Sequence, residues 1–231
     1  MPVGAGGVVH LNVNCTDLDR AVAFYRDEVG LRAQVRTAPD APQDGTAFGL
    51  REAQWDAWMM AGPEGFGAPV VDLLEWKQPP PAPRPRGSAL GFRRLAISAP
   101  GGAARSVVDP DGTLLDLGPG PGGPTGVVVA CSDIARSRAF YRDVVPLAGF
   151  VVLLQANGAA PAPPAANTVG IWRMALGTDD IDADVATLAA AGVACVSPPV
   201  EMSMGPGLPD LRFVLFPGPD GEMLELIERP R

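Results

Sequence analysis

A repeated segment constrains the fold of this chain more than any other feature. Residues 10–26 read HLNVNCTDLDRAVAFYR, and residues 126–142 read GVVVACSDIARSRAFYR. In both copies an alternating apolar run ends at Cys, then Thr or Ser, then Asp, and apolar residues at helical spacing lead to Phe-Tyr-Arg-Asp. Each copy therefore predicts a strand, a capped helix and a further strand. A duplication of this length favours two related domains over one.

Two units of the chain are predicted to be complete. The first is expected to contain strands over 8–14, 32–36, 46–50, 55–60 and 70–76 and a helix over 18–29, with Thr16 or Asp17 as its cap. The last is expected to contain strands over 171–176, 193–197, 211–216 and 222–228, a helix over 181–191 with Asp179 or Asp180 as its cap, and a loop over 198–209.

The two units between them have each lost a part. The second has predicted strands over 92–98, 106–108 and 113–117 but no helix, and the third has a strand, a helix that runs to residue 145 and a strand over 150–155 but no hairpin. A proline-rich segment, 78–86, is predicted to be a stiff linker because its prolines remove backbone donors and favour extended chain. The predicted domains are residues 1–118 and 125–231, with 119–124 as a Gly/Pro linker.

The composition excludes several classes of partner. The net charge is -8 and no basic patch is evident, so nucleic acid is not expected as a partner. No apolar run approaches the ~20 residues that span a bilayer, and the first residues lack a signal-peptide pattern, so we expect a cytoplasmic protein with no membrane contact. Cys15, Cys131 and Cys195 are widely spaced, which favours small core residues over disulfides or metal ligands.

The sequence resembles the vicinal oxygen chelate superfamily of glyoxalases, extradiol dioxygenases, fosfomycin-modifying enzymes and bleomycin-type drug-binding proteins. The segments that carry the resemblance are the two strand–helix copies ending in FYRD, the segment WRMALGTDDIDADVATLAAAGV and the terminal hairpins DPDGTLLDL and GPDGEMLEL. The resemblance implies an α+β fold of tandem βαβββ modules, in a fused two-domain form. In that fold, paired modules enclose a cavity into which metal ligands project from the first and last strands.

The family's ligand positions are only partly kept in this sequence. The first-strand position falls on His10, and its repeat equivalent is Gly126. In the second and fourth units, Arg94 and Arg173 replace the first-strand His of the family. The last-strand carboxylates are Asp72, Asp116 and Glu225 in the first, second and fourth units. No equivalent last strand is expected in the third unit. Because units one and four are the complete ones, we expect a single working cavity between them, lined by His10, Asp72, Arg173 and Glu225.

The replacement of a metal ligand by arginine predicts a site without metal, because a guanidinium has no lone pair to offer a cation. His10, Asp72 and Glu225 remain a possible ligand set for a divalent ion if the arginine were displaced. The favoured alternative pairs Arg173 with Glu225 or Asp72 as a fixed positive charge that binds an oxyanion. His10 is then a candidate acid–base group, or else a buried core histidine.

Aromatic and sulfur-containing residues are candidates for the wall of an apolar cavity. The predicted substrate-binding residues are Trp58, Trp76, Met60, Arg94, Asp116, Met202 and Met204, and the wider apolar set adds Phe48, Trp55, Met59 and Trp172. A role in the ordinary core is the alternative for most of them. Trp76 is expected to share a strand face with Asp72, whereas Trp172 points away from Arg173 if its strand is regular. Tyr25 and Tyr141 recur in both repeats, which favours a packing role.

Three functions follow as expectations. The first is a metal-independent tailoring enzyme of secondary metabolism that performs aldol condensation, dehydration, cyclisation or isomerisation on an aromatic or polyketide-like substrate. The second is a drug-sequestering protein of the bleomycin-resistance type, and the weakest is a metal-dependent lyase or dioxygenase. The expected partner is a hydrophobic aromatic small molecule, and the protein is expected to be a monomer or a homodimer.

Overall fold

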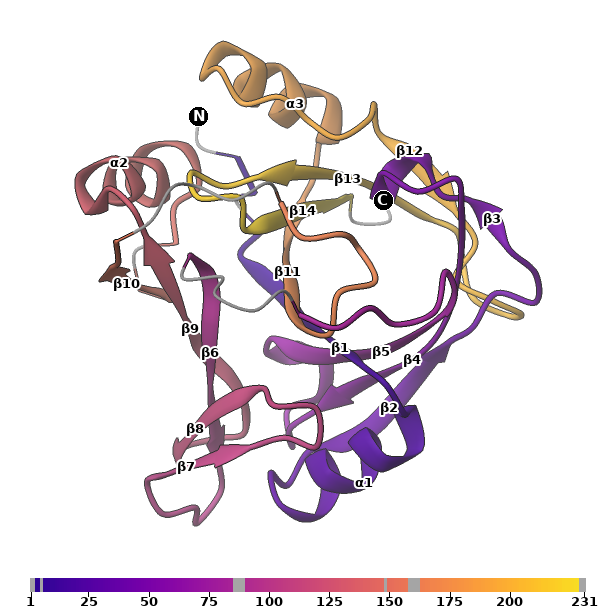
Figure 1. Ribbon diagram of the computed structural model, residues 1–231, viewed down its shortest axis with the longest axis vertical. Coiled ribbons are helices and arrows are strands. Elements are labelled where there is room, and N and C mark those ends of the chain that lie inside the picture. The colour runs from indigo at the N-terminus through magenta and orange to yellow at the C-terminus, as the bar shows by residue number, and fades with distance from the viewer. Residues whose placement is uncertain (1–2, 5, 85–89, 148, 158–162, 229–231) are drawn as a thin grey trace.

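The first strand of each repeat lies inside a β-sheet, between two neighbouring strands, in the computed structural model (Figure 1). The structure describes residues 3–4, 6–84, 90–147, 149–157 and 163–228. β1 (Val8–Cys15) pairs antiparallel with β11 (Gly170–Thr178) of the last unit, and β9 (Gly123–Cys131) pairs antiparallel with β6 (Gly91–Ala99) of the second unit. Units one and four therefore share one sheet, and units two and three share the other.

The remaining elements follow the predicted order. Unit one continues with α1 (Leu18–Asp27), β2 (Arg32–Thr37), β3 (Gln43–Asp44), η1 (Thr46–Phe48), β4 (Glu52–Ala61), η2 (Gly65–Gly67) and β5 (Val70–Gln78). Unit two adds β7 (Arg105–Val108) and β8 (Leu114–Pro119), and unit three adds α2 (Ile134–Ala139), the π-helical turn η3 (Phe140–Val144) and β10 (Val151–Gln155). Unit four adds α3 (Ile181–Ala190), β12 (Val200–Met202), β13 (Leu211–Pro217) and β14 (Met223–Glu228). Within these described elements, unit two has no helix, as expected.

The first sheet curls until its two ends meet. Its order is β12-β13-β14-β11-β1-β5-β4-β2, with β3 paired to β4. Beyond β2, Ala38 donates its backbone N–H to Met204 O at 3.0 Å, and the side chain of Gln43 bonds the backbone of Ser203 in both directions. These bonds join the edge of unit one to the edge of unit four, so the inner face of the sheet encloses a space.

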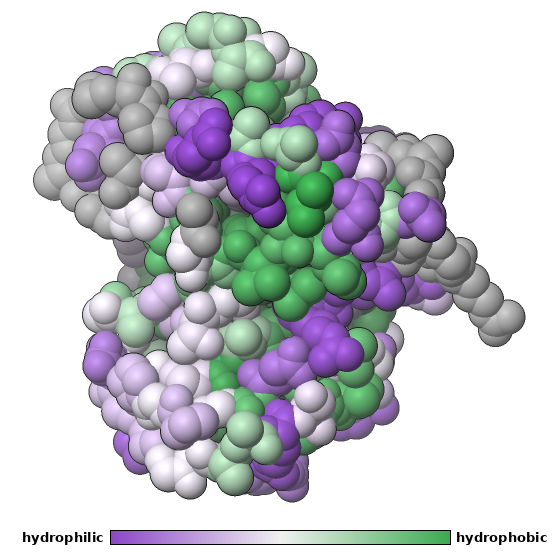
Figure 2. Space-filling view, turned by 90° about the vertical axis from the view of Figure 1, so that its left-hand side faces the viewer, coloured by the Kyte–Doolittle hydropathy of each residue, from purple (hydrophilic) through white to green (hydrophobic). Residues whose placement is uncertain are grey.

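The second sheet has five strands in the order β10-β9-β6-β8-β7. β8 ends at Pro119 and β9 begins at Gly123, so the Gly/Pro segment between the two sequence halves is a turn within this sheet. Figure 2 views the side of the molecule on which these strands lie, and it shows hydrophobic residues in the middle of that face. Val152 and Leu154 of β10 are more than half exposed there.

Aspartate caps begin each α-helix in the described part of the chain. Asp17 accepts the backbone N–H of Arg20 at 2.9 Å, and Asp133 and Asp180 act in the same way on α2 and α3. These bonds satisfy N–H groups that have no partner within a first helical turn. Of the alternatives left open by the sequence, Asp17 and Asp180 are therefore the caps.

The two repeats attach their helices to the rest of the fold in the same way. Tyr25 donates its hydroxyl to Asp109 at 3.3 Å, and Tyr141 donates to Glu222 at 2.6 Å. Both acceptors belong to the Pro-Asp-Gly turns of the following units, and both tyrosines are buried. Burial raises the pKa of Glu222 above its ordinary value, against the opposing effect of the bond from Tyr141. The packing role expected for the tyrosines thus includes a buried hydrogen bond.

Two predicted strands are wrong. Residues 46–50 contain the short helix η1, which lies between Gly45 and the left-handed Gly49 (φ 68°). Residues 193–197 are not a strand, and β12 forms inside the segment expected to be a loop. Val196 still donates its backbone N–H to Leu215 O of β13 at 2.8 Å, but Pro198 and Pro199 lack the N–H that a continuous ladder needs, and the paired strand begins at Val200.

Two hydrophobic clusters fill the described part of the molecule. One lies between the two sheets and the helices, and the other lines the inner face of the first sheet around Trp55, Trp76 and Trp172. Cys15 and Cys131 are buried and Cys195 is half-buried, all as free thiols. In the predicted linker, Ala82 pairs with Thr168, while residues 85–86 lie outside the described residues. Among the helices described, none is long and apolar enough to cross a membrane.

Candidate active site

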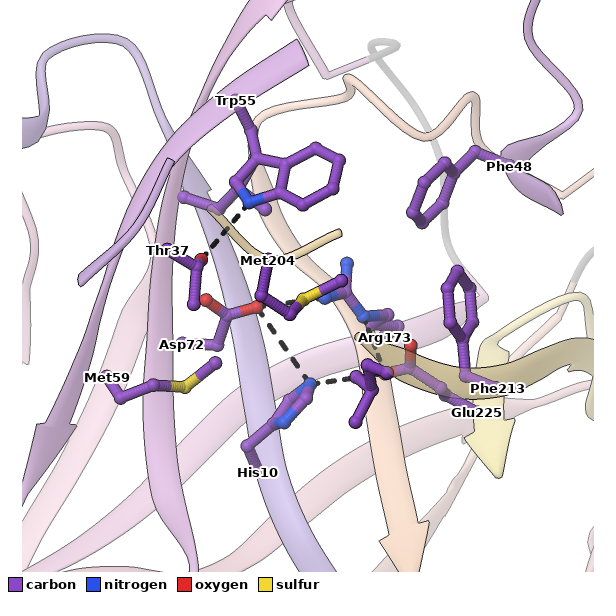
Figure 3. A pocket seen from close by; sticks show the side chains of 12 residues that line it. His10, Thr37, Phe48, Trp55, Met59, Asp72, Arg173, Met204, Phe213 and Glu225 are labelled. Atoms are coloured by element: carbon purple, nitrogen blue, oxygen red, sulfur yellow. Dashed lines mark hydrogen bonds and ion pairs between the residues drawn. The ribbon is translucent and has the colours of Figure 1, made fainter. Parts of the chain in front are cut away.

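Four polar side chains meet inside the curled sheet (Figure 3). Arg173 donates from Nε to Glu225 Oε2 at 2.8 Å and from Nη2 to Asp72 Oδ2 at 2.9 Å. His10 Nε2 lies 3.2 Å from Glu225 Oε2 and 3.9 Å from Asp72 Oδ2. All four side chains are buried. The structure thus places the four residues selected from the sequence in one cavity, between units one and four.

The register of four adjacent strands explains why these residues meet. Asn12 on β1 lies opposite Arg173 on one side and Asp72 on the other, and Ala175 lies between His10 and Glu225. Side chains alternate between the faces of a strand, so His10, Asn12 and Asn14 share the inner face of β1, while Leu11, Val13 and Cys15 pack in the outer cluster.

A β-bulge positions Arg173. Asn12 pairs with Arg173 and Val13 with Ile171, so Trp172 is an extra residue on β11. Because of the bulge, Trp172 and Arg173 both lie on the inner side, and the guanidinium carbon is 5.4 Å from the centre of the Trp172 ring. The expectation that Trp172 points away from Arg173 is therefore wrong, since it assumed a regular strand.

The charges of the site favour an ionised Glu225. Burial by itself raises the pKa of this carboxyl, but Arg173 and His10 outweigh burial and hold the pKa below its ordinary value of 4.5. Asp72 Oδ2 accepts from both Arg173 and Asn12. The site thus combines two carboxyl groups with one guanidinium and one imidazole.

Several polar atoms of the site have no hydrogen-bond partner within the described protein. They are His10 Nε2, Asn12 Oδ1, Asp72 Oδ1 and Arg173 Nη1, and the one other such buried side-chain atom among the described residues is Thr113 Oγ1. Buried polar groups are nearly always bonded in folded proteins. Their concentration at one place indicates a site that offers donors and acceptors to a bound molecule.

The wall of the cavity is mainly apolar. Its lining consists of His10, Thr37, Phe48, Trp55, Met59, Asp72, Leu74, Arg173, Met204, Leu211, Phe213 and Glu225. The free volume is about 30 Å³, which holds one or two water molecules. Met59 and Met204 border this space, and the flexible thioether chains of methionine adapt readily to a neighbour.

Of the predicted substrate-binding residues, one lines the cavity. Met204 does so, whereas Trp58 and Met60 lie on the opposite face of β4, because Trp55 and Met59 occupy its inner face. Trp76 shares the face of Asp72 as expected but packs behind the wall, where its indole donates to Asn14 at 3.2 Å. Met202 borders a separate groove between η1 and β12.

Arg94 and Asp116 lie on the second sheet, away from this cavity. Arg94 Nη1 contacts Asp116 Oδ1 at 3.0 Å, and both side chains are more than a third exposed. Their strands pair in the same register as those of Arg173 and Glu225. They are therefore an exposed copy of the buried pair, on a sheet that lacks the strands needed to enclose it.

The third unit does have a strand equivalent to β5, contrary to expectation. β10 runs parallel to β9 in the register that β5 has with β1, so Val152 stands at the position of Asp72. Glu75 of β5 accepts the first N–H of α1, and Gln155 of β10 accepts the first N–H of α2. With Gly126 in place of His10, the second sheet keeps only the arginine and one carboxylate.

Sequence reasoning missed four residues of the wall: Thr37, Leu74, Leu211 and Phe213. Leu74 was accessible from the sequence, because it stands two residues after Asp72 on one strand. Phe213 and Leu211 share the inner face of β13, which faces the cavity only because the sheet closes on itself. Thr37 accepts the indole N–H of Trp55 at 3.1 Å.

The residues present do not fit a metal ion. The Arg173 guanidinium bonds both carboxylates of the potential ligand set, so each is already paired with a group that cannot be a ligand. Among the residues that the structure describes, no cluster of three or more His, Cys, Asp or Glu is arranged to hold one. The chemistry of this site is therefore derived from its side chains alone.

Comparison with solved structures identifies the fold. A single-residue variant of glyoxalase I from Zea mays matches with a TM-score of 0.65 and 19% identity over 96% of this chain and 92% of that one. A proposed dioxygenase from Bacillus subtilis matches with a TM-score of 0.65 and 13% identity over 98% and 86% of the two chains. The chain has the vicinal oxygen chelate fold. The resemblance drawn from the sequence is thereby confirmed for the fold, while neither a protein-family model nor a curated protein matches the sequence.

This chain places His10, Asp72, Arg173 and Glu225 on neighbouring strands of units one and four. The two matched proteins are similar to it over nearly their whole length. At these identities the likeness establishes architecture, so the reaction must be argued from the geometry of the cavity.

Proposed function

We propose that this protein is a metal-independent enzyme that moves a proton next to a carbonyl group of a small molecule. One observation carries the proposal: an imidazole nitrogen without a hydrogen-bond partner, His10 Nε2, lies 3.2 Å from Glu225 in a cavity that also holds an unpartnered guanidinium N–H of Arg173. A base and an oxyanion-binding donor in one buried site are the two groups that enolisation needs.

The reaction would begin with transfer of a carbon-bound proton to His10 Nε2. The electron pair of the broken C–H bond moves to the carbonyl oxygen, and Arg173 Nη1 donates a hydrogen bond to the resulting enolate. Glu225 Oε2 lies 3.2 Å from the same nitrogen, so its negative charge stabilises the imidazolium that forms. Return of the proton to another carbon gives isomerisation, and attack of the enolate on a second carbonyl gives aldol condensation or ring closure, with dehydration as a further step.

The proposal extends to a role in secondary metabolism with an aromatic or polyketide-like substrate. The aromatic wall formed by Phe48, Trp55 and Phe213 supports a flat apolar ligand. The names of the two matched proteins, a glyoxalase and a proposed dioxygenase, support an enzyme. A metal-dependent lyase or dioxygenase is disfavoured by the Arg173 contacts.

Drug sequestration is the second candidate. The same apolar wall favours it, because a binding protein needs a cavity with a few orienting polar groups and no base. The two candidates differ in what His10 does. A catalyst loses turnover when His10 is replaced, whereas a binding protein has no turnover to lose.

The test compares metabolites of the native host with those of a strain that lacks this gene. Under the enzyme proposal, an intermediate accumulates, and the purified protein converts it. Unchanged metabolites together with new sensitivity to the host's own product would contradict catalysis and support sequestration.

A further inference from the structure

A second, larger space lies next to the cavity along the inner face of the curled sheet. On β14 the inner face reads Met223, Glu225 and Ile227, and Glu225 belongs to the cavity while Met223 borders a cleft of about 390 Å³. On β13, Phe213 lines the cavity and Leu215 the cleft. The two spaces therefore follow each other along the strands.

The lining of this cleft is apolar. It consists of Phe48, Gly49, Pro163, Pro164, Ala165, Trp172, Ala194, Cys195, Val196, Leu215, Pro217 and Met223, without any charged side chain. Val196 is 38% exposed in it. A cleft of this size and chemistry suits a hydrocarbon or aromatic group.

Phe48 separates the cleft from the cavity and lines both. Its ring centre is 5.5 Å from that of Phe213 and 6.2 Å from that of Trp172, and Figure 3 shows Phe48 and Phe213 on the side of the cavity away from Met59. Phe48 is half-buried and ends η1, where the left-handed Gly49 follows. Phe48 is therefore a side chain that the two spaces share.

The charge of the cavity selects the group that binds there. The cavity already holds two carboxyl groups against one guanidinium, so a carboxylate ligand would bring a third acid into a buried place. A neutral carbonyl avoids this cost and still accepts a hydrogen bond from Arg173. Negative charge then develops on its oxygen only as the proton moves to His10.

We infer that the substrate is a neutral carbonyl compound with an apolar tail. The carbonyl binds at Arg173 and His10, and the tail passes Phe48 into the cleft beside Trp172. This inference rests on the proposed function, which supplies the carbonyl. The space at the other end of the cavity, about 380 Å³, is a poorer site for the tail because Glu228 and several glycines border it.

The test measures affinity for a series of methyl ketones from 2-butanone to 2-nonanone by tryptophan fluorescence. For each methylene that enters the cleft, affinity should rise about fourfold. In Ala194→Trp, which fills the cleft from its exposed rim, this gain should disappear, while 2-butanone, too short to reach the cleft, binds as before. Octanoate should bind more weakly than 2-octanone at pH 7.

Ala68→Trp, at the opposite end, is the matched control and should keep the full dependence on chain length. Loss of that dependence in Ala68→Trp but not in Ala194→Trp would overturn the inference, as would an equal affinity for all ketones or no binding of any. Chain-length-dependent binding without conversion of any carbonyl compound would contradict the proposed function and leave the inference standing. Conversion of a carbonyl compound without chain-length dependence of binding would overturn the inference and leave the proposed function standing.

Discussion

Arg173 on β11 donates to Asp72 on β5 at 2.9 Å, and this buried bond joins the last unit of the chain to the first. The same guanidinium bonds Glu225 on β14. One cation therefore holds together carboxylates from both complete units. The fold and the candidate site depend on the same side chain, which makes Arg173 the first residue to test.

Replacing Arg173 by Met should lower the free energy of unfolding by about 3–5 kcal/mol, because Asp72 and Glu225 would stay buried without a cation. Urea denaturation at pH 7 measures this change. The matched control is Arg94→Met at the equivalent exposed pair, where a loss under about 1 kcal/mol is expected. Equal losses of unfolding free energy in Arg173→Met and Arg94→Met would contradict the conclusion that Arg173 is the buried cation of the pair.

The stabilising effect of Glu225 should depend on pH. Its pKa is lowered in the folded state, so the ionised carboxylate stabilises the fold above the ordinary value of 4.5, and this effect is lost as pH falls through the folded-state pKa. The difference in unfolding free energy between wild type and Glu225→Gln should be largest near neutral pH and shrink on acidification. If denaturation curves at a series of pH values gave the same difference in unfolding free energy at every pH, the lowered pKa of Glu225 would be refuted.

Glu222→Gln supplies the opposite case. The pKa of Glu222 is raised by burial, so the folded state binds its proton more tightly and ionisation costs stability as pH rises above 4.5. Relative to wild type, Glu222→Gln should therefore become more stable as pH increases. The two variants together show whether the sign of each pKa shift is right.

His10 is the single histidine of the chain, so its ring gives one identifiable NMR signal in untagged protein labelled at histidine. Glu225→Gln should shift that signal, because Glu225 lies 3.2 Å from Nε2. Asp116→Asn, at the equivalent position of the second sheet, should leave it in place. A signal that responds equally to both variants would mean that His10 is not in contact with Glu225.

Metal binding should depend on Arg173. Protein purified without chelators should carry less than one divalent ion per chain, and added Zn²⁺ should not move the His10 signal, since the guanidinium already bonds both carboxylates. In Arg173→Ala, the set of His10, Asp72 and Glu225 becomes free for a cation, and Zn²⁺ should then bind. Stoichiometric metal in the wild type, measured by elemental analysis, would disprove this.

The site residues were predictable through the resemblance to the vicinal oxygen chelate superfamily. The repeat aligns His10 with Gly126, and the resemblance places the ligand positions of the complete units on His10, Asp72, Arg173 and Glu225. Unit two lacks its helix and unit three was expected to lack its hairpin, which indicated that the complete units one and four pair with each other. Repeat alignment depends on regular register, which the pairings of β5 with β1 and of β14 with β11 keep.

The errors in the predicted site arise where the pairing register of a strand is irregular, or where the closure of the first sheet brings together residues far apart in the sequence. The extra residue at Trp172 turns a side chain to the inner face, and no sequence pattern marks this bulge. Trp58 and Met60 were predicted to line the cavity, but they lie on the outer face of β4. Neighbouring residues of a strand point to opposite faces, so an error of one residue in the assumed register puts a side chain on the wrong face. Val152 was missed as the equivalent of Asp72 because an apolar residue stands at the position of an acid.

The central claim is that His10 takes a proton from a bound carbonyl compound. The most direct measurement is exchange of that proton with deuterium in D₂O, followed by NMR, using the metabolite that accumulates in the strain lacking this gene. Wild type should exchange it, and His10→Ala should bind as tightly but exchange about 10²–10⁴ times more slowly. Binding without exchange in wild type, or equal exchange in both forms, would contradict the account.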